Sequence, residues 1–255
     1  MWTERAIMVS VPDYTDPVCA YDCLAPEFAC LACHHRAYFD TIDRLITVQI
    51  PPGSHSLLDV GAGDGTRASR IAEFAGCPEL VLLEPSAAMR ARAPKHAKVL
   101  DMRAEDLARV DAQFDAITCL WNVLGHIFPA AARAEVLRQF ARLLSPQGVA
   151  FVDVSHRYNA QHYGVLPTAG RFLRDRLAPN QRNGDVTVTW KVAGVPCTTP
   201  GHVFTHAEFA ALCRVAGLDI ARRYVVDYAT GVPRRWSFQG HLLYVLRRQS
   251  HTSSI

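Results

Sequence analysis

Short apolar runs alternate along the chain with segments in which apolar residues return at helical spacing. Residues 57–60, 80–83 and 114–120 are such runs, and an unbroken, branched apolar run is typical of a parallel strand covered on both faces. Residues 130–144 carry apolar side chains at helical spacing and predict a covering helix. Strands that alternate with helices predict an α/β fold with a mostly parallel sheet.

Weaker patterns complete a doubly wound sheet of seven strands. They predict further strands at 98–100, 149–154, 220–228 and 241–246, and further helices at 17–25, 27–48, 67–75 and 205–216. The last of these helices has Thr205 as a capping residue and Glu208 three positions later, which is the pattern of a capping box.

An insertion at about 155–204 separates the fifth strand from the last helix. Its first part, 155–183, looks irregular and is rich in His, Tyr and Arg. Residues 185–192 alternate in the manner of a strand, 194–200 predict a turn, and 201–204 are a possible partner strand. The loop at 155–183 either binds an anionic or aromatic small molecule or is a solvated loop.

A glycine-rich turn follows the first strand. Gly61, Gly63 and Gly65 allow a tight turn and the close approach of a ligand, and free amides at the start of the next helix favour an anion. The spacing is G-x-G-x-G, and Thr66 stands where a dinucleotide site has its third glycine. The spacing therefore disfavours an NAD-dependent oxidoreductase, and the motif of a P-loop is absent from the sequence.

An acidic residue marks the end of the second strand. Glu84 lies 25 residues after Asp59, at a place where a carboxylate can accept both ribose hydroxyls of a nucleoside. The glycine turn and this carboxylate together predict a nucleoside pocket at the carboxyl edge of the sheet.

Five blocks in order resemble the class I S-adenosylmethionine-dependent methyltransferases. They are 57–66, 83–86 with Met89, 103–107, 114–117 and 143–149, and they cover roughly residues 55–155. The resemblance implies a Rossmann-like fold with an N-terminal helical lid at 1–50, a cofactor-binding domain at 51–255, and S-adenosyl-L-methionine as the cofactor. It implies these cofactor-binding residues: Asp59, Gly61, Ala62, Gly63, Glu84, Pro85, Met89, Ala104, Glu105, Leu120 and Arg36.

The resemblance also bears on individual side chains. Tyr21 in the lid would line the active site, and Arg36 would reach the cofactor carboxylate; the alternatives are a packed tyrosine and an exposed arginine. Arg103 holds a position that is usually acidic, so Glu105 is the substitute for the contact with the adenine amine.

Side chains past the fourth strand are the candidates for catalysis. His126 titrates near neutrality and can act as a base towards an amine or a hydroxyl, or it packs at the start of the next segment. Trp121 can present its ring to the sulfonium of the cofactor. Tyr21 and Tyr158 would frame the acceptor together with His126.

Composition and charge exclude several classes of protein. The chain has 255 residues, 49% of them hydrophobic, which describes a globular protein. A formal net charge of +3, with basic pairs that are scattered, gives no sign of a nucleic-acid partner. No segment has the pattern of a membrane span or a signal peptide, so we expect a cytoplasmic protein, either a monomer or a homodimer.

Eight cysteines raise the question of a metal site. Cys19, Cys23, Cys30 and Cys33 are close in sequence, but on a helical projection they share one side. We therefore expect two helices that pack a cysteine-lined face, no metal, and reduced thiols.

The sequence thus predicts an enzyme that transfers a methyl group from S-adenosylmethionine to a nitrogen or oxygen of a small-molecule metabolite. Three alternatives stay open. The first is cyclisation of the cofactor with release of methylthioadenosine, as in azetidine-carboxylate synthases. The second is methylation of RNA, and the third is a non-catalytic protein that keeps the fold as a binding surface.

Overall fold

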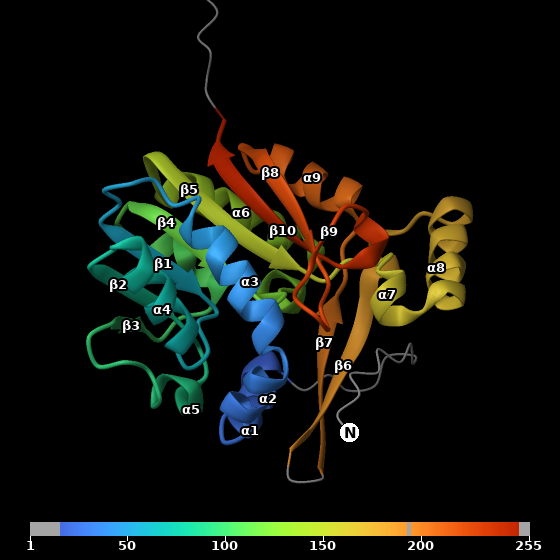
Figure 1. The fold of residues 1–255 in the computed structure, drawn as a ribbon, viewed down its shortest axis with the longest axis horizontal. Helices are drawn as coiled ribbons and strands as arrows, with labels where there is room; N and C mark the ends of the chain where they lie inside the picture. Colours follow the sequence, from blue (N-terminus) through green and yellow to red (C-terminus); the bar gives the residue numbers. More distant parts are fainter. Residues whose placement is uncertain (1–15, 193–194, 250–255) are drawn as a thin grey trace, which may run out of the picture.

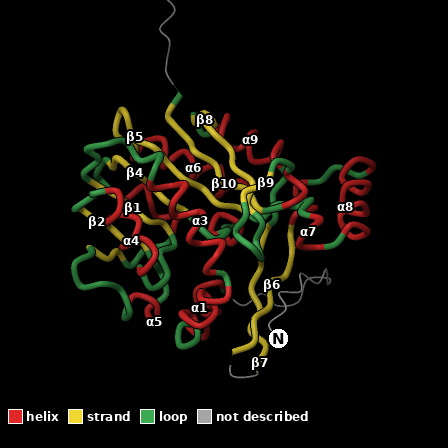
Figure 2. Tube along the Cα trace, viewed as in Figure 1, coloured by secondary structure: helices red, strands yellow, loops and turns green. Residues whose placement is uncertain are grey.

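The computed structural model describes residues 16–192 and 195–249. Within these residues eight strands form one sheet (Figure 1, Figure 2). They are β1 (Ser56–Val60), β2 (Glu79–Leu83), β3 (Lys98–Leu100), β4 (Phe114–Cys119), β5 (Leu144–Val154), β8 (Leu218–Val226), β9 (Pro233–Arg234) and β10 (His241–Arg248). Their order is β3-β2-β1-β4-β5-β10-β8-β9.

The first five strands are parallel, and β10 runs antiparallel to both β5 and β8. The predicted α/β class with a mostly parallel, doubly wound sheet is confirmed. The sheet has one more strand than the seven predicted, because the two-residue β9 pairs with the edge of β8.

Helices cover both faces of the sheet, as the continuous apolar strands require. Leu57 packs in the cluster formed with α3 (Arg36–Thr47) and α4 (Thr66–Ala75). Its neighbour Leu58 packs with α6 (Ala130–Leu143) and α9 (His206–Val215), since successive side chains of a strand point to opposite faces. All five residues of β1 are buried.

The capping box predicted for the last helix is confirmed. Glu208 donates its backbone N–H to Thr205 Oγ1 at 3.1 Å, and Thr205 donates its N–H to Glu208 Oε2 at 3.4 Å. The remaining helices are α1 (Pro17–Leu24), α2 (Phe28–His34), α5 (Ala87–Arg90), α7 (Ala160–Tyr163) and α8 (Val165–Leu177), with 3₁₀ turns at Ala104–Arg109, Val123–His126, Gln181–Gly184 and Ser237–Gln239.

The N-terminal helices differ from the prediction in two respects. The segment 27–48 is two helices, α2 and α3, because the chain leaves helical geometry at His35, whose ring stacks on Tyr228. Cys19, Cys23, Cys30 and Cys33 are exposed, so the predicted cysteine-lined face is wrong. The chain turns between α1 and α2, so one helical projection does not describe both. Residues 1–15 of the predicted lid lie outside the described residues.

The insertion also holds more regular structure than the sequence predicted. Strands β6 (Asp185–Val192) and β7 (Val195–His202) pair as an antiparallel hairpin, so the predicted turn at 194–200 is wrong. Pro196 and Pro200 suggested a turn, but each strand of a hairpin has an outer edge that needs no backbone donor. The segment 155–183 contains α7 and α8, the latter at the side of the molecule in Figure 1, and is not irregular.

A buried ionic cluster ties this insertion to α9. Arg157 places Nη1 2.9 Å from Asp175 and Nη2 2.5 Å from Glu208. The ring of His202, at the end of β7, lies 2.7 Å from Asp185 and 2.7 Å from Glu208. Charge-assisted hydrogen bonds are strong, but removal of one partner leaves a buried charge without compensation and destabilises the fold.

None of the helices in the described part of the chain combines the length and the apolar character that a bilayer span requires.

Substitution of Arg157 tests this cluster. Arg157→Met would remove the cation between the largely buried carboxylates of Asp175 and Glu208, and we expect the free energy of unfolding to fall by about 3 kcal/mol. Urea unfolding measures the change. The matched control is Arg182→Met, because Arg182 is 76% exposed and 3.6 Å from Asp185, and an exposed pair is worth about 0.5 kcal/mol. Equal losses in the two variants would contradict the assignment.

Candidate active site

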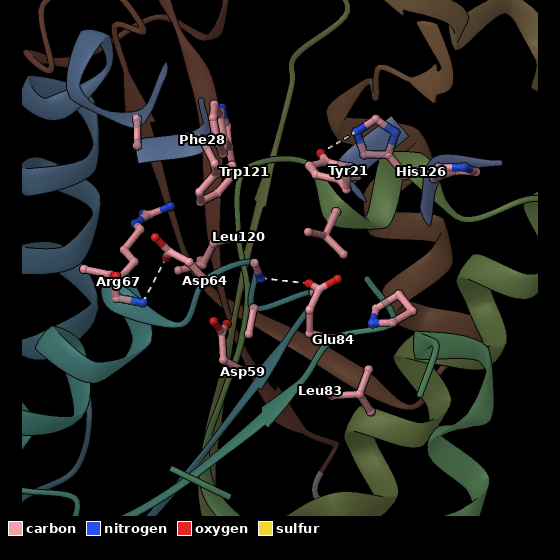
Figure 3. A pocket seen from close by; sticks show the side chains of 18 of the residues that line it. Tyr21, Phe28, Asp59, Asp64, Arg67, Leu83, Glu84, Leu120, Trp121 and His126 are labelled. Atoms are coloured by element: carbon pink, nitrogen blue, oxygen red, sulfur yellow. Dashed lines mark hydrogen bonds between the residues drawn. The ribbon is translucent and has the colours of Figure 1, made fainter. Parts of the chain in front are cut away.

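Two adjoining cavities lie at the carboxyl ends of the parallel strands, where open α/β sheets bind their ligands. The larger encloses about 410 Å³ and the smaller about 70 Å³. Three residues line both cavities: Tyr21 of α1, Trp121 just after β4, and His126. Figure 3 shows Tyr21, Trp121 and His126 together with the side chains of the larger cavity.

The floor of the larger cavity is the glycine turn after β1. Gly61 has a φ of +72°, and a Cβ at this position would approach Val123 Cγ1 to 2.5 Å. Gly65 has a φ of +71°, and a Cβ there would approach Leu82 Cδ1 to 2.5 Å. Both backbone conformation and space therefore require glycine at these two positions.

Glu84 extends from the end of β2 into this cavity. Its carboxylate accepts a hydrogen bond from the backbone N–H of Gly63 at 2.8 Å (Figure 3) and one from the N–H of Ser86, also at 2.8 Å. The side chain is buried, and burial raises the pKa of Glu84 to about 7 because desolvation disfavours the charged form.

Strand β1 contributes a second buried carboxyl group, that of Asp59. Asp59 Oδ1 accepts a hydrogen bond of 2.6 Å from Thr118 Oγ1 on the neighbouring strand β4. Burial raises the pKa of Asp59 to about 6. Two carboxyl groups on adjacent strands thus lie in the wall of one cavity.

The N-terminal helices supply the opposite wall. Tyr21, Phe28 and Arg36 come from α1, α2 and α3. Arg36 is 74% exposed and lies 3.5 Å from Asp40, so it stands at the rim. Arg67 of α4 is more deeply placed, with its guanidinium 4.4 Å from the centre of the Phe39 ring.

The structure brings nearly all of the predicted cofactor-binding residues to this cavity. Those that line it are Asp59, Gly61, Ala62, Gly63, Glu84, Pro85, Ala104, Glu105, Leu120 and Arg36. Met89 lines neither cavity and is a correction, because it is buried inside α5, where its N–H bonds to the capping Ser86 Oγ at 3.1 Å.

Of the predicted acceptor-framing residues, Tyr21 and His126 meet at the junction of the cavities, with Tyr21 Oη 3.4 Å from His126 Nε2. Tyr158 is a correction. It lines neither cavity, because its hydroxyl donates a hydrogen bond of 2.6 Å to Asp175 and its ring packs on Phe172.

Hydrogen bonding fixes the tautomer of His126. Its Nδ1 lies 2.8 Å from the carbonyl oxygen of Pro200, which can only accept, so Nδ1 carries the hydrogen and Nε2 keeps its lone pair. Burial lowers the pKa of His126 below the usual value. The ring is therefore neutral at neutral pH, with Nε2 ready to accept a proton.

The smaller cavity, which we call the side chamber, has aromatic and uncharged walls. Hairpin residues Val188 and Trp190 form one wall, and His162, Tyr228 and His241 form another. None of the described residues that line it is Asp, Glu, Lys or Arg. Burial lowers the pKa of His162 and lowers that of His241 well below the usual value, so both rings are neutral at neutral pH.

Sequence reasoning did not find most of the side chamber. His241 and Tyr228 belong to no motif, and they meet the insertion only through the antiparallel end of the sheet. The alternation at 185–192 was recognisable, and it places Val186, Val188 and Trp190 on the face that lines the chamber.

Comparison with known proteins gives consistent matches. A family model described as a methyltransferase domain matches residues 33–222. The chain is 34% identical over 198 residues to the dTDP-4-amino-2,3,4,6-tetradeoxy-D-glucose N,N-dimethyltransferase of Saccharopolyspora spinosa, covering 71% of this chain and 76% of that protein. It is 30% identical over 174 residues to a ubiquinone biosynthesis O-methyltransferase of Neisseria meningitidis, covering 65% of this chain and 64% of that protein.

Among solved structures, the fold matches an S-adenosylmethionine-dependent methyltransferase from Clostridium acetobutylicum. The TM-score is 0.65 at 13% sequence identity, over 88% of this chain and 99% of that one. This likeness concerns the fold.

Proposed function

Because this chain belongs to the family of S-adenosylmethionine-dependent methyltransferases, we propose that it methylates an amine nitrogen of a small molecule. The enzyme class and the cofactor predicted from the sequence are confirmed by the family, and relatives that methylate nitrogen or oxygen of small molecules confirm that broader prediction. The choice of an amine is our own inference from the side chamber.

The larger cavity fits the cofactor. The turn lines the cavity with Gly61, Ala62 and Gly63, so a ligand can approach the backbone there, and Glu84 offers a carboxylate for ribose hydroxyls. Ala104 and Glu105 would flank the adenine, Leu120 would also contact the cofactor, and Arg36 at the rim would face the cofactor carboxylate. When bound, the cofactor supplies an electrophilic methyl group on a positively charged sulfur.

The observation that carries the proposal is the uncharged, aromatic side chamber beside this cavity. Transfer of the methyl group to a neutral amine moves a positive charge into the acceptor, and aromatic faces such as those of Trp190, Tyr21 and Trp121 stabilise an ammonium by cation–π attraction. A hydroxyl acceptor would gain from a nearby cation that favours its ionised form, and the described lining contains neither Lys nor Arg.

His126 is the residue we assign as the base. Its Nε2 can take the proton that the methylated ammonium releases, while the bond from Nδ1 to Pro200 keeps the lone pair on Nε2. Tyr21, within 3.4 Å of Nε2, orients the ring from the lid side. Most of the rate would come from holding the acceptor in line between the two cavities.

The division into lid and binding domain stays a prediction. We propose that the segment 1–50, which includes α1, α2 and α3, acts as the lid over the cofactor and that 51–255 form the binding domain. A chamber of about 70 Å³ favours a small-molecule acceptor over a nucleic acid. A cytoplasmic location, and a monomer or a homodimer, are the expectations that the sequence supports.

The direct test supplies the purified protein with S-adenosylmethionine and a panel of acceptors. The panel pairs amino sugars and their dTDP-linked forms, chosen after the Saccharopolyspora relative, with the corresponding hydroxy sugars and with catechols. We expect S-adenosylhomocysteine and a methylated product with amines only. Methylation confined to hydroxyl acceptors, or release of methylthioadenosine, would contradict the proposal.

The affinity for S-adenosylmethionine should depend on the protonation of Glu84. With its pKa at about 7, this carboxyl is mostly protonated at pH 6 and mostly ionised at pH 8. Only the ionised form accepts both ribose hydroxyls, so we expect affinity to rise about tenfold over this range. Calorimetric titration at several pH values measures it. Glu84→Gln should bind weakly at every pH, and the exposed Glu79→Gln should behave as wild type; a pH dependence that persists in Glu84→Gln would exclude Glu84 as its source.

Replacement of His126 should separate turnover from cofactor binding. We expect His126→Ala to lower kcat about 100-fold, the usual contribution of a general base, with the Kd for S-adenosylmethionine changed less than about threefold. Steady-state kinetics and calorimetry give the two values. His55→Ala, which removes a 66% exposed histidine that lines neither cavity, is the control. Parallel loss of cofactor affinity would assign His126 to binding.

A further inference from the structure

The chain takes an uncommon backbone path directly after β4. Trp121 has a φ of 55° and Asn122 a φ of 60°, and these are the two non-glycine residues with positive φ within residues 16–192 and 195–249. Side chains with a Cβ seldom adopt the left-handed region, and two in succession persist only where the surroundings hold them.

One buried residue, Asp153, stabilises this backbone conformation. Asp153, near the end of β5, accepts the N–H of Trp121 on Oδ2 at 3.1 Å and the N–H of Asn122 on its backbone oxygen at 3.0 Å. Its other carboxylate oxygen, Oδ1, accepts the hydroxyl of Tyr38 at 2.6 Å. Asp153 therefore satisfies both backbone donors of the left-handed pair, and Tyr38 provides a partner for its remaining carboxylate oxygen.

The side chains of the pair are fixed as well. Asn122 accepts the N–H of Ser155 at 3.0 Å and donates to the carbonyl oxygen of His202 at 3.2 Å, which ties it to β7. Trp121 donates its indole N–H to Tyr228 Oη at 2.9 Å. The left-handed turn thus has a single arrangement of both side chains.

This arrangement determines where the indole ring lies. Trp121 lines both the cofactor cavity and the side chamber, so it stands where the two reacting molecules would meet. An extended backbone at 121 and 122 would direct the two side chains elsewhere, because successive side chains of a strand alternate in direction.

We propose that Asp153 is a positioning residue for methyl transfer. It holds the left-handed turn and thereby keeps the Trp121 ring at the junction of the cofactor cavity and the side chamber. The inference rests on the proposed function, in that the reaction takes place across this junction. Asp153 itself lines neither cavity, so it acts through Trp121 and touches neither ligand.

Three variants separate this role from a merely structural one. Asp153→Ala removes the acceptor for the Trp121 N–H, and we expect kcat to fall at least about tenfold while the Kd for S-adenosylhomocysteine changes less than about threefold. Asp153→Asn should restore most of the turnover, because the amide can accept from Trp121 and donate to the oxygen of Tyr38. Tyr38→Phe loses only the bond to Oδ1 and should keep kcat within about twofold of wild type.

A spectroscopic readout follows the ring itself. The part of the tryptophan fluorescence change that S-adenosylhomocysteine causes in wild type but not in Trp121→Phe reports Trp121. We expect that part to disappear in Asp153→Ala and to persist in Asp153→Asn and Tyr38→Phe. If Asp153→Ala does not fold, Asp153→Ser, whose hydroxyl is too short to replace both carboxylate contacts, carries the same expectations.

Two results would overturn the proposal. One is an Asp153→Ala protein with the wild-type kcat and fluorescence change, and the other is an Asp153→Asn protein as impaired as Asp153→Ala, which would assign the effect to charge. If the wild type methylates no amine, the proposed function fails, whereas the fluorescence measurement with S-adenosylhomocysteine still decides the role of Asp153.

Discussion

The hydrogen bond between His126 Nδ1 and the Pro200 carbonyl oxygen joins the parallel sheet to the inserted hairpin, and the active site depends on that union. The hairpin supplies one wall of the side chamber with Val188 and Trp190, and its Pro200 carbonyl oxygen fixes the tautomer of His126. This bond joins the hairpin to the segment after β4, as does the bond from Asn122 to the His202 carbonyl oxygen, and it also leaves the lone pair on Nε2 of His126, so the placement of the hairpin and the chemistry of His126 are coupled.

A two-stranded hairpin is marginal by itself, so it needs an anchor elsewhere in the fold. The ionic cluster of Arg157, Asp175, His202 and Glu208 is that anchor. Glu208 serves twice, because it also completes the capping box of α9. A residue that the sequence marks as a local helix signal thus also fixes the base of β7, two positions beyond the carbonyl that holds His126.

Patterns within a short stretch of sequence predicted those features of the site that depend on residues close together in the chain. The glycine turn and Glu84 were found because spacing along one strand–turn–helix unit fixes both, and the parallel order brings their ends together. The prediction for Tyr158 was wrong because its hydroxyl bonds to Asp175, which is seventeen residues later in the chain. Asp175 lies in α8, a helix that contains Pro167 and Gly170, two residues that are uncommon inside helices. Asp153 carried no signal at all, since its importance comes from a backbone conformation at Trp121 that no spacing reveals.

Burial shifts the pKa of three side chains in the two cavities. It raises the pKa of Glu84 to about 7 and that of Asp59 to about 6, and it lowers the pKa of His126, so each group is shifted towards its neutral form. The side chamber, whose described lining holds no Asp, Glu, Lys or Arg, suits the proposed reaction, in which one positive charge moves from cofactor to acceptor. In the proposed reaction, ionised Glu84 would favour the cationic cofactor on one side of the junction, and on the other side the aromatic rings would stabilise the ammonium without a carboxylate that retains the product. That charge would cross at Trp121, Tyr21 and His126, the three side chains that line both cavities, so their fixed placement is what the proposed chemistry requires.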